Sequence, residues 1–127
     1  MAAGFSTDGA FSGFSVREMD ATKAFYGDLL GLDVTEEGMG ILRIGLSSDT
    51  FVIAYPKPHH QPATFTIMNF PVDDVDAAVD DLVSRGIAMK FYDGMPQDAK
   101  GIMKGNGPDI AWFLDPSENV LAVVQSS

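Results

Sequence analysis

The only two histidines of the chain, His59 and His60, are adjacent, and imidazole is both a common metal ligand and a common general base. They lie in a segment that contains Pro56, Pro58 and Pro62, which is typical of a connector. Nothing in the sequence places a nucleophile beside them, so no Ser-His-Asp arrangement is indicated. The chain has no cysteine, which excludes disulfides, thiolate nucleophiles and cysteine-ligated metals. We therefore interpret the two histidines as part of a linker.

A second group with possible chemistry is acidic, and it lies among the apolar residues Val75, Val79 and Leu82. Its members are Asp73, Asp74, Asp76, Asp80 and Asp81. Such a group could hold a cation, but its spacing is that of the solvated face of a helix, with charges that are favourable near the helix N-terminus. The Gly-rich segment of residues 92–109 is long enough to be a lid or rim, although its glycines are too irregular for a phosphate-binding loop.

The overall charge limits the partners. The formal charge is −10, from 18 acidic and 8 basic residues, so we expect no nucleic-acid partner. The acidic field could attract a cationic ligand, although solubility is the simpler interpretation. No segment has the ~20 consecutive apolar residues of a membrane span, and the first ten residues lack the Lys or Arg of a secretory signal. We therefore predict a cytoplasmic protein with no membrane partner.

The elements that must position any site form a pattern that occurs twice. The first half predicts a strand at residues 10–16, a helix capped by Asp20 and closed by Gly31, and strands at residues 33–37, 41–46 and 50–55. After the connector, the second half predicts a strand at 64–72, a helix capped by Asp74 and closed by Gly86, and strands at 87–91, 110–114 and 120–125. The 127 residues thus predict a single α+β domain of two βαβββ modules, at about residues 10–55 and 64–125, joined by a linker at 56–63. Two such mixed sheets, each with its helix on one face, would curve around a shared groove, with both histidines far from it.

Two motifs resemble a known family. The first is a strand followed by an FYxxxLGL helix end, formed by Phe14, Ser15 and Val16 and then by Phe25, Tyr26, Gly27, Asp28, Leu29, Leu30, Gly31 and Leu32. The second resembles an F-x-D-P-x-G-N-x-L hairpin and runs from Trp112 to Leu121, with Glu118 where the glycine is usual. Together with the repeat, they resemble the vicinal oxygen chelate superfamily of glyoxalases, bleomycin-resistance proteins and dioxygenases, over residues 10–125. If Glu118 is left-handed, the turn carries roughly 1 kcal/mol of strain.

The resemblance also implies where a metal would bind. Members of the family that use a metal hold it with side chains on the first and last strands of each module. The matching positions here are Phe11, Ala54, Ile67 and Ala122, and none of these side chains can coordinate a cation. We therefore expect no metal and no cofactor.

Strand alternation extends the groove to residues two positions away on the same strands. We expect the following residues to face it: Gly13, Ser15, Val52, Asn69, Val120 and Val124. Trp112 and Phe11 would be stacking surfaces, with Ser15 and Asn69 as hydrogen-bonding groups, although Trp112 could equally fill the core. The opposite, helix-facing side would receive Phe14, Met68, Phe70, Leu121 and Val123.

The resulting hypothesis is a metal-independent homodimer that binds a small organic ligand, aromatic or cationic, through Phe11, Ser15, Val52, Ala54, Ile67, Asn69, Trp112, Ala122 and Val124. One alternative is a glyoxalase- or dioxygenase-like lyase, isomerase or oxidoreductase that uses Glu18 or Asp98 with a relocated metal. Another is a scaffold whose groove is closed by dimerisation.

Overall fold

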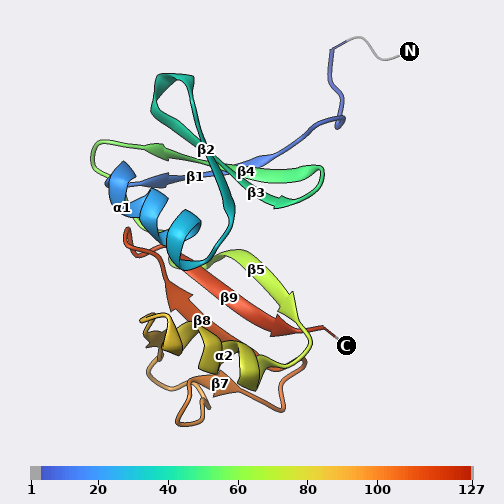
Figure 1. Cartoon of the computed structure of the whole chain (residues 1–127). Coiled ribbons are helices and arrows are strands. Elements are labelled where there is room, and N and C mark those ends of the chain that lie inside the picture. The colour runs from blue at the N-terminus through green and yellow to red at the C-terminus, as the bar shows by residue number, and fades with distance from the viewer. Residues whose placement is uncertain (1–3, 127) are drawn as a thin grey trace. The chain divides into compact units, whose positions relative to one another are not determined.

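The structure is a computed structural model that describes residues 4–126 (Figure 1). The chain divides into two compact units between His60 and Gln61, inside the predicted connector. None of the helices in residues 4–126 is long and apolar enough to cross a membrane.

The first unit contains a four-stranded mixed sheet. Its elements are β1 (Ser12–Val16), α1 (Met19–Lys23), the π-helical turn η1 (Ala24–Leu29), β2 (Asp33–Glu37), the 3₁₀ turn η2 (Gly38–Gly40), β3 (Ile41–Ser47) and β4 (Thr50–Pro56). The sheet order is β1-β4-β3-β2, in which β1 and β4 are parallel and the other pairs are antiparallel.

The helical segment of the first unit differs from the prediction at its start. The N-cap is Glu18, not Asp20, because the backbone of Glu18 is extended and its carboxylate accepts hydrogen bonds from the amides of Asp20 and Ala21 at 3.0 and 2.6 Å. Asp20 itself lies inside α1. The end agrees with the prediction, since Gly31 has φ +76 directly after the helical residues. Tyr26 is fully buried, and its ring lies 5.8 Å from that of Phe14, which fixes the face of the sheet that the helix covers.

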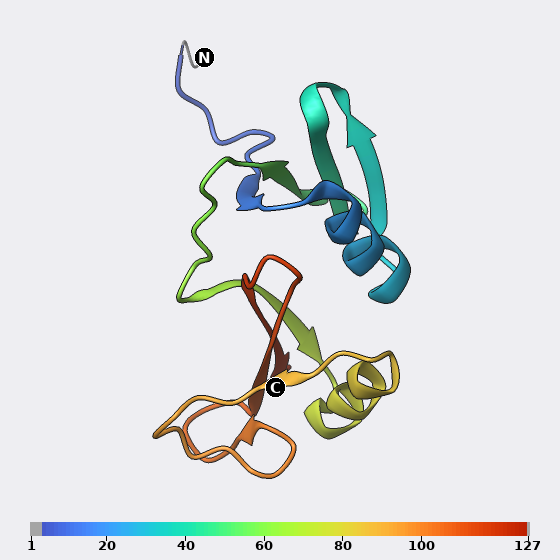
Figure 2. The same cartoon turned by 90° about the vertical axis from the view of Figure 1, so that its left-hand side faces the viewer.

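The second unit repeats this arrangement. Its elements are β5 (Thr66–Val72), α2 (Val75–Ser84), β6 (Met89–Lys90), β7 (Ile102–Met103), β8 (Ile110–Leu114) and β9 (Val120–Gln125). The order β5-β9-β8-β6 matches that of the first sheet, and its first and last strands, β5 and β9, are again parallel (Figure 2). The repeated topology confirms the predicted α+β architecture of two βαβββ units.

Two details of the second unit were not predicted. Strand β6 has two residues rather than five, and the segment predicted as irregular contains β7, which pairs with β8. A two-residue strand followed by Lys104 and Gly105 has no alternation that could reveal it. The predicted helix boundaries are confirmed: Asp74 accepts a hydrogen bond from the amide of Ala77, and Gly86 has φ +91.

The last hairpin of the second unit, residues 115–119, is held by a buried carboxylate. Oδ1 of Asp115 accepts hydrogen bonds from the amides of Ser117 and Asn119, both at 2.9 Å, and Oδ2 accepts one from Nδ2 of Asn119 at 3.0 Å. These three side chains are buried. Glu118 has φ 68 and is therefore left-handed, as its position in the family motif implied.

Candidate functional site

Each sheet has one face that its own helix covers and one that it does not, which we call the helix-free face. In the first sheet, pairing places Gly13 opposite Ile53 and Ser15 opposite Tyr55. Arg43 pairs with Ile53 from the other side. Residues that pair directly on neighbouring strands share a face. The helix-free face of the first sheet therefore carries Phe11, Gly13, Ser15, Arg43, Phe51, Ile53 and Tyr55.

Two predicted site residues do not lie on this face. Ala54 pairs with Phe14, and Phe14 contacts Tyr26 of the helical segment, so Ala54 is on the helix-covered face, where it is fully buried. Val52, two residues earlier, shares that face. The placement of Ala54 and Val52 beside Phe11 and Ser15 was wrong because alternation fixes faces within a strand but not the register between β1 and β4.

Aromatic side chains dominate the helix-free face of the first sheet. The rings of Phe11 and Phe51 stack with centroids 4.8 Å apart and planes inclined by 28°. The guanidinium carbon of Arg43 lies 3.8 Å from the centroid of Phe51, which is cation–π geometry. Phe11 is 54% exposed, and Arg43 is also exposed. We call these three residues the aromatic platform.

A histidine lies at the other end of the same face. Nδ1 of His60 is 2.6 Å from Oγ of Ser15, and His60 is buried. The expectation that both histidines lie far from the predicted site is therefore wrong for His60. The chain returns toward β1 after β4, since the amide of Lys57 donates to the carbonyl of Val16 and His59 is left-handed with φ 60. This return brings His60 against Ser15.

The residues described do not suit a metal of the kind that the family implies. Within residues 4–126, no three His, Cys, Asp or Glu side chains form a group that could hold a metal ion. The carboxylates named for the enzyme alternative bond backbone amides: Glu18 caps α1, and Asp98 accepts from the amides of Lys100 and Ile102. A relocated metal site on Glu18 or Asp98 would have to displace these hydrogen bonds.

The helix-free face of the second sheet matches the prediction more closely. Asn69 pairs with Ala122, and Trp112 pairs with Ala122 from the other side, so these three share a face. Val120 and Val124 follow on the same side of β9. Ile67 lies at an irregularity in the β5–β9 register, where Thr66 rather than Ile67 is opposite Val120. Pairing therefore does not assign Ile67 to this face.

Trp112 is largely buried on this face rather than available as a stacking surface. It is 8% exposed and packs with Val120 and Ala122. The ring of Tyr92 meets it edge to face, with centroids 5.5 Å apart and planes at 89°. Burial also raises the pKa of the Tyr92 hydroxyl. The partly exposed aromatic ring is thus Tyr92, and Lys90 Nζ lies 5.5 Å from its centroid.

A cavity of about 310 Å³ lies beside these residues in the second unit. Its lining consists of Pro62, Ala63, Thr64, Lys90, Tyr92, Leu114, Glu118 and Val120. Strand alternation could have found two residues that the prediction missed, because Lys90 pairs with Trp112 and Leu114 is two residues from it. Tyr92 had no such signal, since it follows the end of β6. This volume is at the lower end of the range for small-molecule sites.

Two repeated βαβββ units, each with a mixed sheet whose first and last strands are parallel, define the fold class of the chain. A family model described as "Glyoxalase/Bleomycin resistance protein/Dioxygenase superfamily" matches residues 11–123, and the chain belongs to this superfamily. The predicted family resemblance is thereby confirmed.

Solved structures with the same fold include several relatives. TnmS3, described as an antibiotic binding protein from Streptomyces sp. CB03234, is 25% identical, with a TM-score of 0.65 over 99% of this chain and 100% of that one. A fosfomycin resistance protein, FosX, from Listeria monocytogenes is 15% identical, with a TM-score of 0.67 over 100% and 96%. A putative glyoxalase family protein from Bacillus anthracis is 15% identical, with a TM-score of 0.66 over 100% of both chains. No curated protein matches the sequence.

Proposed function

We propose that this protein is a metal-independent binding protein for a small, planar aromatic molecule. The observation that carries the proposal is the aromatic platform, because the ring of Phe11 is 54% exposed and is held by stacking on the partly buried Phe51, which Arg43 also contacts. An exposed ring that is fixed in this way is suited to a further flat π-system. A sheet face with exposed aromatic rings also leaves apolar surface in water unless something covers it.

Several further features support this assignment. Gly13 lies between Phe11 and Ser15 on the same face, and a Cβ there would lie 2.9 Å from Cγ1 of Ile53. Glycine is therefore the residue that lets Ile53 lie flat against β1. The second unit adds a cavity that is bordered by Tyr92 and Lys90, another ring with a cation nearby. TnmS3, a structural relative, is described as an antibiotic binding protein, which agrees with a role in binding rather than in catalysis.

The donor set argues against a metal-dependent reaction at the family positions. Phe11, Ile67 and Ala122 offer only hydrocarbon, and Ala54 lies on the helix-covered face. Divalent metals need imidazole, carboxylate or thiolate ligands.

A thermal-shift screen tests the proposal. Planar aromatic compounds should raise the unfolding temperature, because a ligand that binds only the folded state stabilises it by mass action. Stabilisation by Ni, Zn, Mn or Fe, with none by any organic compound, would refute it.

A matched pair of variants locates the site. We expect Phe11→Leu to weaken the binding of a planar hit from the screen by about 2- to 10-fold, the effect of one aromatic contact worth about 0.5–1.5 kcal/mol, because Phe11 is the exposed ring of the platform. The control is Phe5→Leu, since Phe5 is 88% exposed and lies outside the platform. Equal affinity in both variants would place the ligand elsewhere.

We also propose that the protein is a cytoplasmic homodimer. Sedimentation velocity at several protein concentrations tests the dimer, and a single species with the mass of one chain would refute it. Fractionation of the source cells tests the compartment.

A further inference from the structure

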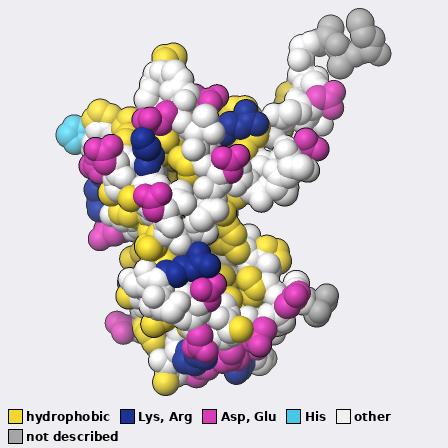
Figure 3. Space-filling model, viewed as in Figure 1, with side chains coloured by type: hydrophobic (Ala, Val, Ile, Leu, Met, Phe, Trp, Pro, Cys, Tyr) yellow, Lys and Arg dark blue, Asp and Glu magenta, His cyan; other side chains and the backbone are white. Residues whose placement is uncertain are grey.

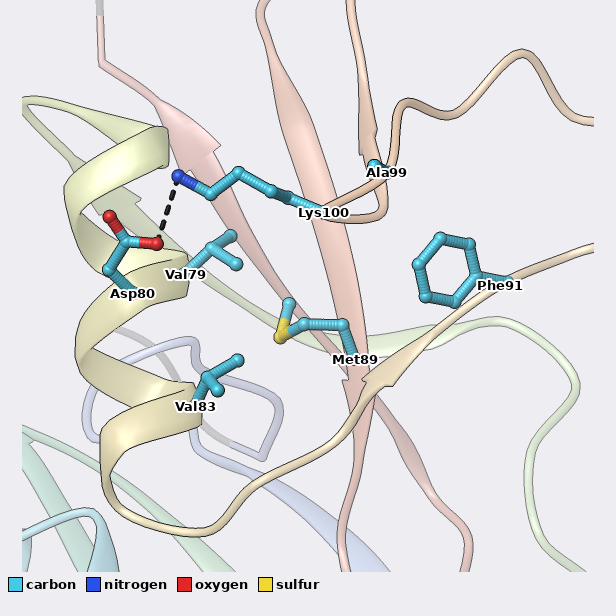
Figure 4. Close-up of a pocket in the computed structure, with 7 residues that line it drawn as sticks. All are labelled: Val79, Asp80, Val83, Met89, Phe91, Ala99 and Lys100. Atoms are coloured by element: carbon cyan, nitrogen blue, oxygen red, sulfur yellow. Dashed lines mark ion pairs between the residues drawn. The ribbon is translucent and has the colours of Figure 1, made fainter.

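A second cavity in the second unit lies on the other side of its sheet, next to the helix. It has a volume of about 330 Å³ and is lined by Val79, Asp80, Val83, Met89, Phe91, Ala99 and Lys100 (Figure 4). Met89 pairs with Phe113, which is fully buried with the residues of the helix-covered face. This cavity, which we call the helix-side cavity, is therefore separate from the helix-free face and from the aromatic platform.

The walls of the helix-side cavity are apolar and partly exposed. Val79 is fully buried and belongs to the core, whereas Val83 and Phe91 are 54% and 52% exposed. In Figure 4, Val79 and Val83 extend from α2 toward the side chains of Met89 and Phe91. An apolar group that filled the space between Val83 and Phe91 would remove apolar surface of both side chains from water, which is favourable.

The loop that closes the cavity is fixed by its own hydrogen bonds. Oδ1 of Asp98 accepts from the amides of Lys100 and Ile102, both at 2.9 Å. Nε2 of Gln97 donates to the carbonyls of Lys90 and Gly101 at 3.0 and 2.9 Å. Because this wall is already in place, a ligand would not have to supply the free energy of ordering it.

Gly101 allows the loop to lie this close to the strand. Its φ is +88, and a Cβ would lie 3.4 Å from both Cβ of Met89 and Cζ of Phe91. The left-handed backbone and the tight approach both favour glycine here. The segment of residues 92–109, expected from the sequence to be a lid or rim, thus supplies a rigid wall.

At the polar end of the cavity, two lysines pair with two aspartates that are exposed to solvent. Nζ of Lys100 lies 2.9 Å from Oδ1 of Asp80 and 3.4 Å from Oδ1 of Asp76, and Lys104 also pairs with Asp76 at 3.4 Å. The hydrogen bond to Asp80 is the main reason that the pKa of Lys100 is raised. All of these side chains are at least 38% exposed, and ion pairs of this kind are worth only about 0–1 kcal/mol. Loss of the ion pair between Lys100 and Asp80 therefore costs little free energy.

The surrounding charge selects the sign of a ligand. An incoming carboxylate that bonded Lys100 would come close to Asp80 and Asp76, whereas an incoming ammonium would replace Lys100 on Asp80. The whole chain carries −10, from 18 acidic and 8 basic residues, and Figure 3 shows acidic side chains on the surface of both units. This field raises the local concentration of small cations.

We propose that the helix-side cavity binds a small arylalkyl amine, with its ring between Val83 and Phe91 and its ammonium group on the carboxylate of Asp80. The proposal does not depend on the function proposed for the aromatic platform, because the two sites share no residue. The volume of the cavity, about 330 Å³, is at the lower end of the range for small-molecule sites.

The test is a titration of the full chain with 2-phenylethylamine, followed through the backbone amide signals by NMR. Saturable shifts should concentrate at residues 79–83, 89–91 and 99–101. Asp80→Asn should weaken binding at least fivefold, whereas the control Asp81→Asn should leave it within twofold, because Asp81 pairs with Arg85 at 3.0 Å and does not line the cavity.

Two further measurements separate this site from simple attraction by an acidic surface. Lys100→Met should tighten amine binding, because it removes the competing ammonium group, and Ala99→Trp should abolish binding by filling the cavity. Equal losses in Asp80→Asn and Asp81→Asn, an absence of saturable shifts at the cavity, or tighter binding of 3-phenylpropionate than of the amine would each overturn the proposal.

Discussion

Replacement of Glu118 by glycine should stabilise the protein. Glu118 has φ 68, and a left-handed backbone costs a non-glycine residue roughly 1–2 kcal/mol. Glycine loses roughly 0.5–1 kcal/mol more than other residues in chain entropy on folding, so the expected net gain is about 0.5–1 kcal/mol. The two backbone hydrogen bonds of the hairpin run from the amide of residue 118 to the carbonyl of Asp115 and from the amide of Asp115 to the carbonyl of Asn119. These bonds, and those that the Asp115 carboxylate accepts, do not use the side chain of residue 118 and are kept in the variant.

The control for this prediction is Glu118→Ala, which removes the same side chain but keeps the left-handed cost. Urea unfolding followed by the fluorescence of Trp112, the only tryptophan, gives the free energy of unfolding of all three proteins. The glycine variant should exceed the alanine variant by about 0.5–1 kcal/mol, or by a few degrees in unfolding temperature. If the two variants are equally stable, the backbone argument is wrong and the effect belongs to the glutamate side chain.

Three other side chains give testable expectations. Asp115→Ala should lower the free energy of unfolding by about 3–5 kcal/mol in urea unfolding, because it leaves the buried donors of Asn119 without their carboxylate. Burial raises the pKa of Tyr92, so an ultraviolet titration should show a tyrosine that ionises above the usual value of about 10. This titration step should be missing in Tyr92→Phe. The free energy of unfolding that depends on the neutral hydroxyl should be fully present below the usual tyrosine pKa and lost as pH rises through the raised pKa. The pKa of Asp98 is lowered chiefly by the hydrogen bond from the amide of Ile102. Hydrogen exchange at that amide should therefore be slow above the ordinary carboxyl pKa and should speed up, relative to an unfolded reference, as pH falls through the lowered pKa. Asp98→Ala should lack this pH dependence.

The fold could be predicted because its signals are local and occur twice. Asp74 caps a helix with apolar residues at helical spacing, and Gly31 and Gly86 end their helices with left-handed backbones. The strand bounds of β2, β8 and β9 agree with the prediction because turn residues flank each of them. The two-residue β7 was missed, since it is too short for any periodic signal.

The candidate site could be predicted only in part because a site depends on contacts between distant segments. Alternation along β1 predicted that Phe11 and Ser15 share a face, but the register with β4, about 40 positions later, decides that Phe51 and Tyr55 join them in place of Val52 and Ala54.

The burial of individual side chains could not be predicted from the sequence either, because it depends on contacts with other segments. Trp112 was expected equally as a ligand surface or as core, and the ring of Tyr92, which comes from outside the strand, decides for the core. His60 was assigned to a connector on composition alone, yet the return of the chain after β4 places it beside Ser15.

The parallel pairing of first and last strands has a consequence for the order in which each unit can form. Strand β9 is the last element of its unit along the chain, so it is synthesised after all the others. It also lies between β5 and β8 in the sheet, so both of these strands depend on it for pairing. Until Val120–Gln125 has emerged, β5 and β8 expose unpaired backbone edges, which are prone to pair with other chains. The interval between synthesis of β8 and of β9 is therefore the period in which the nascent second unit is most exposed to aggregation.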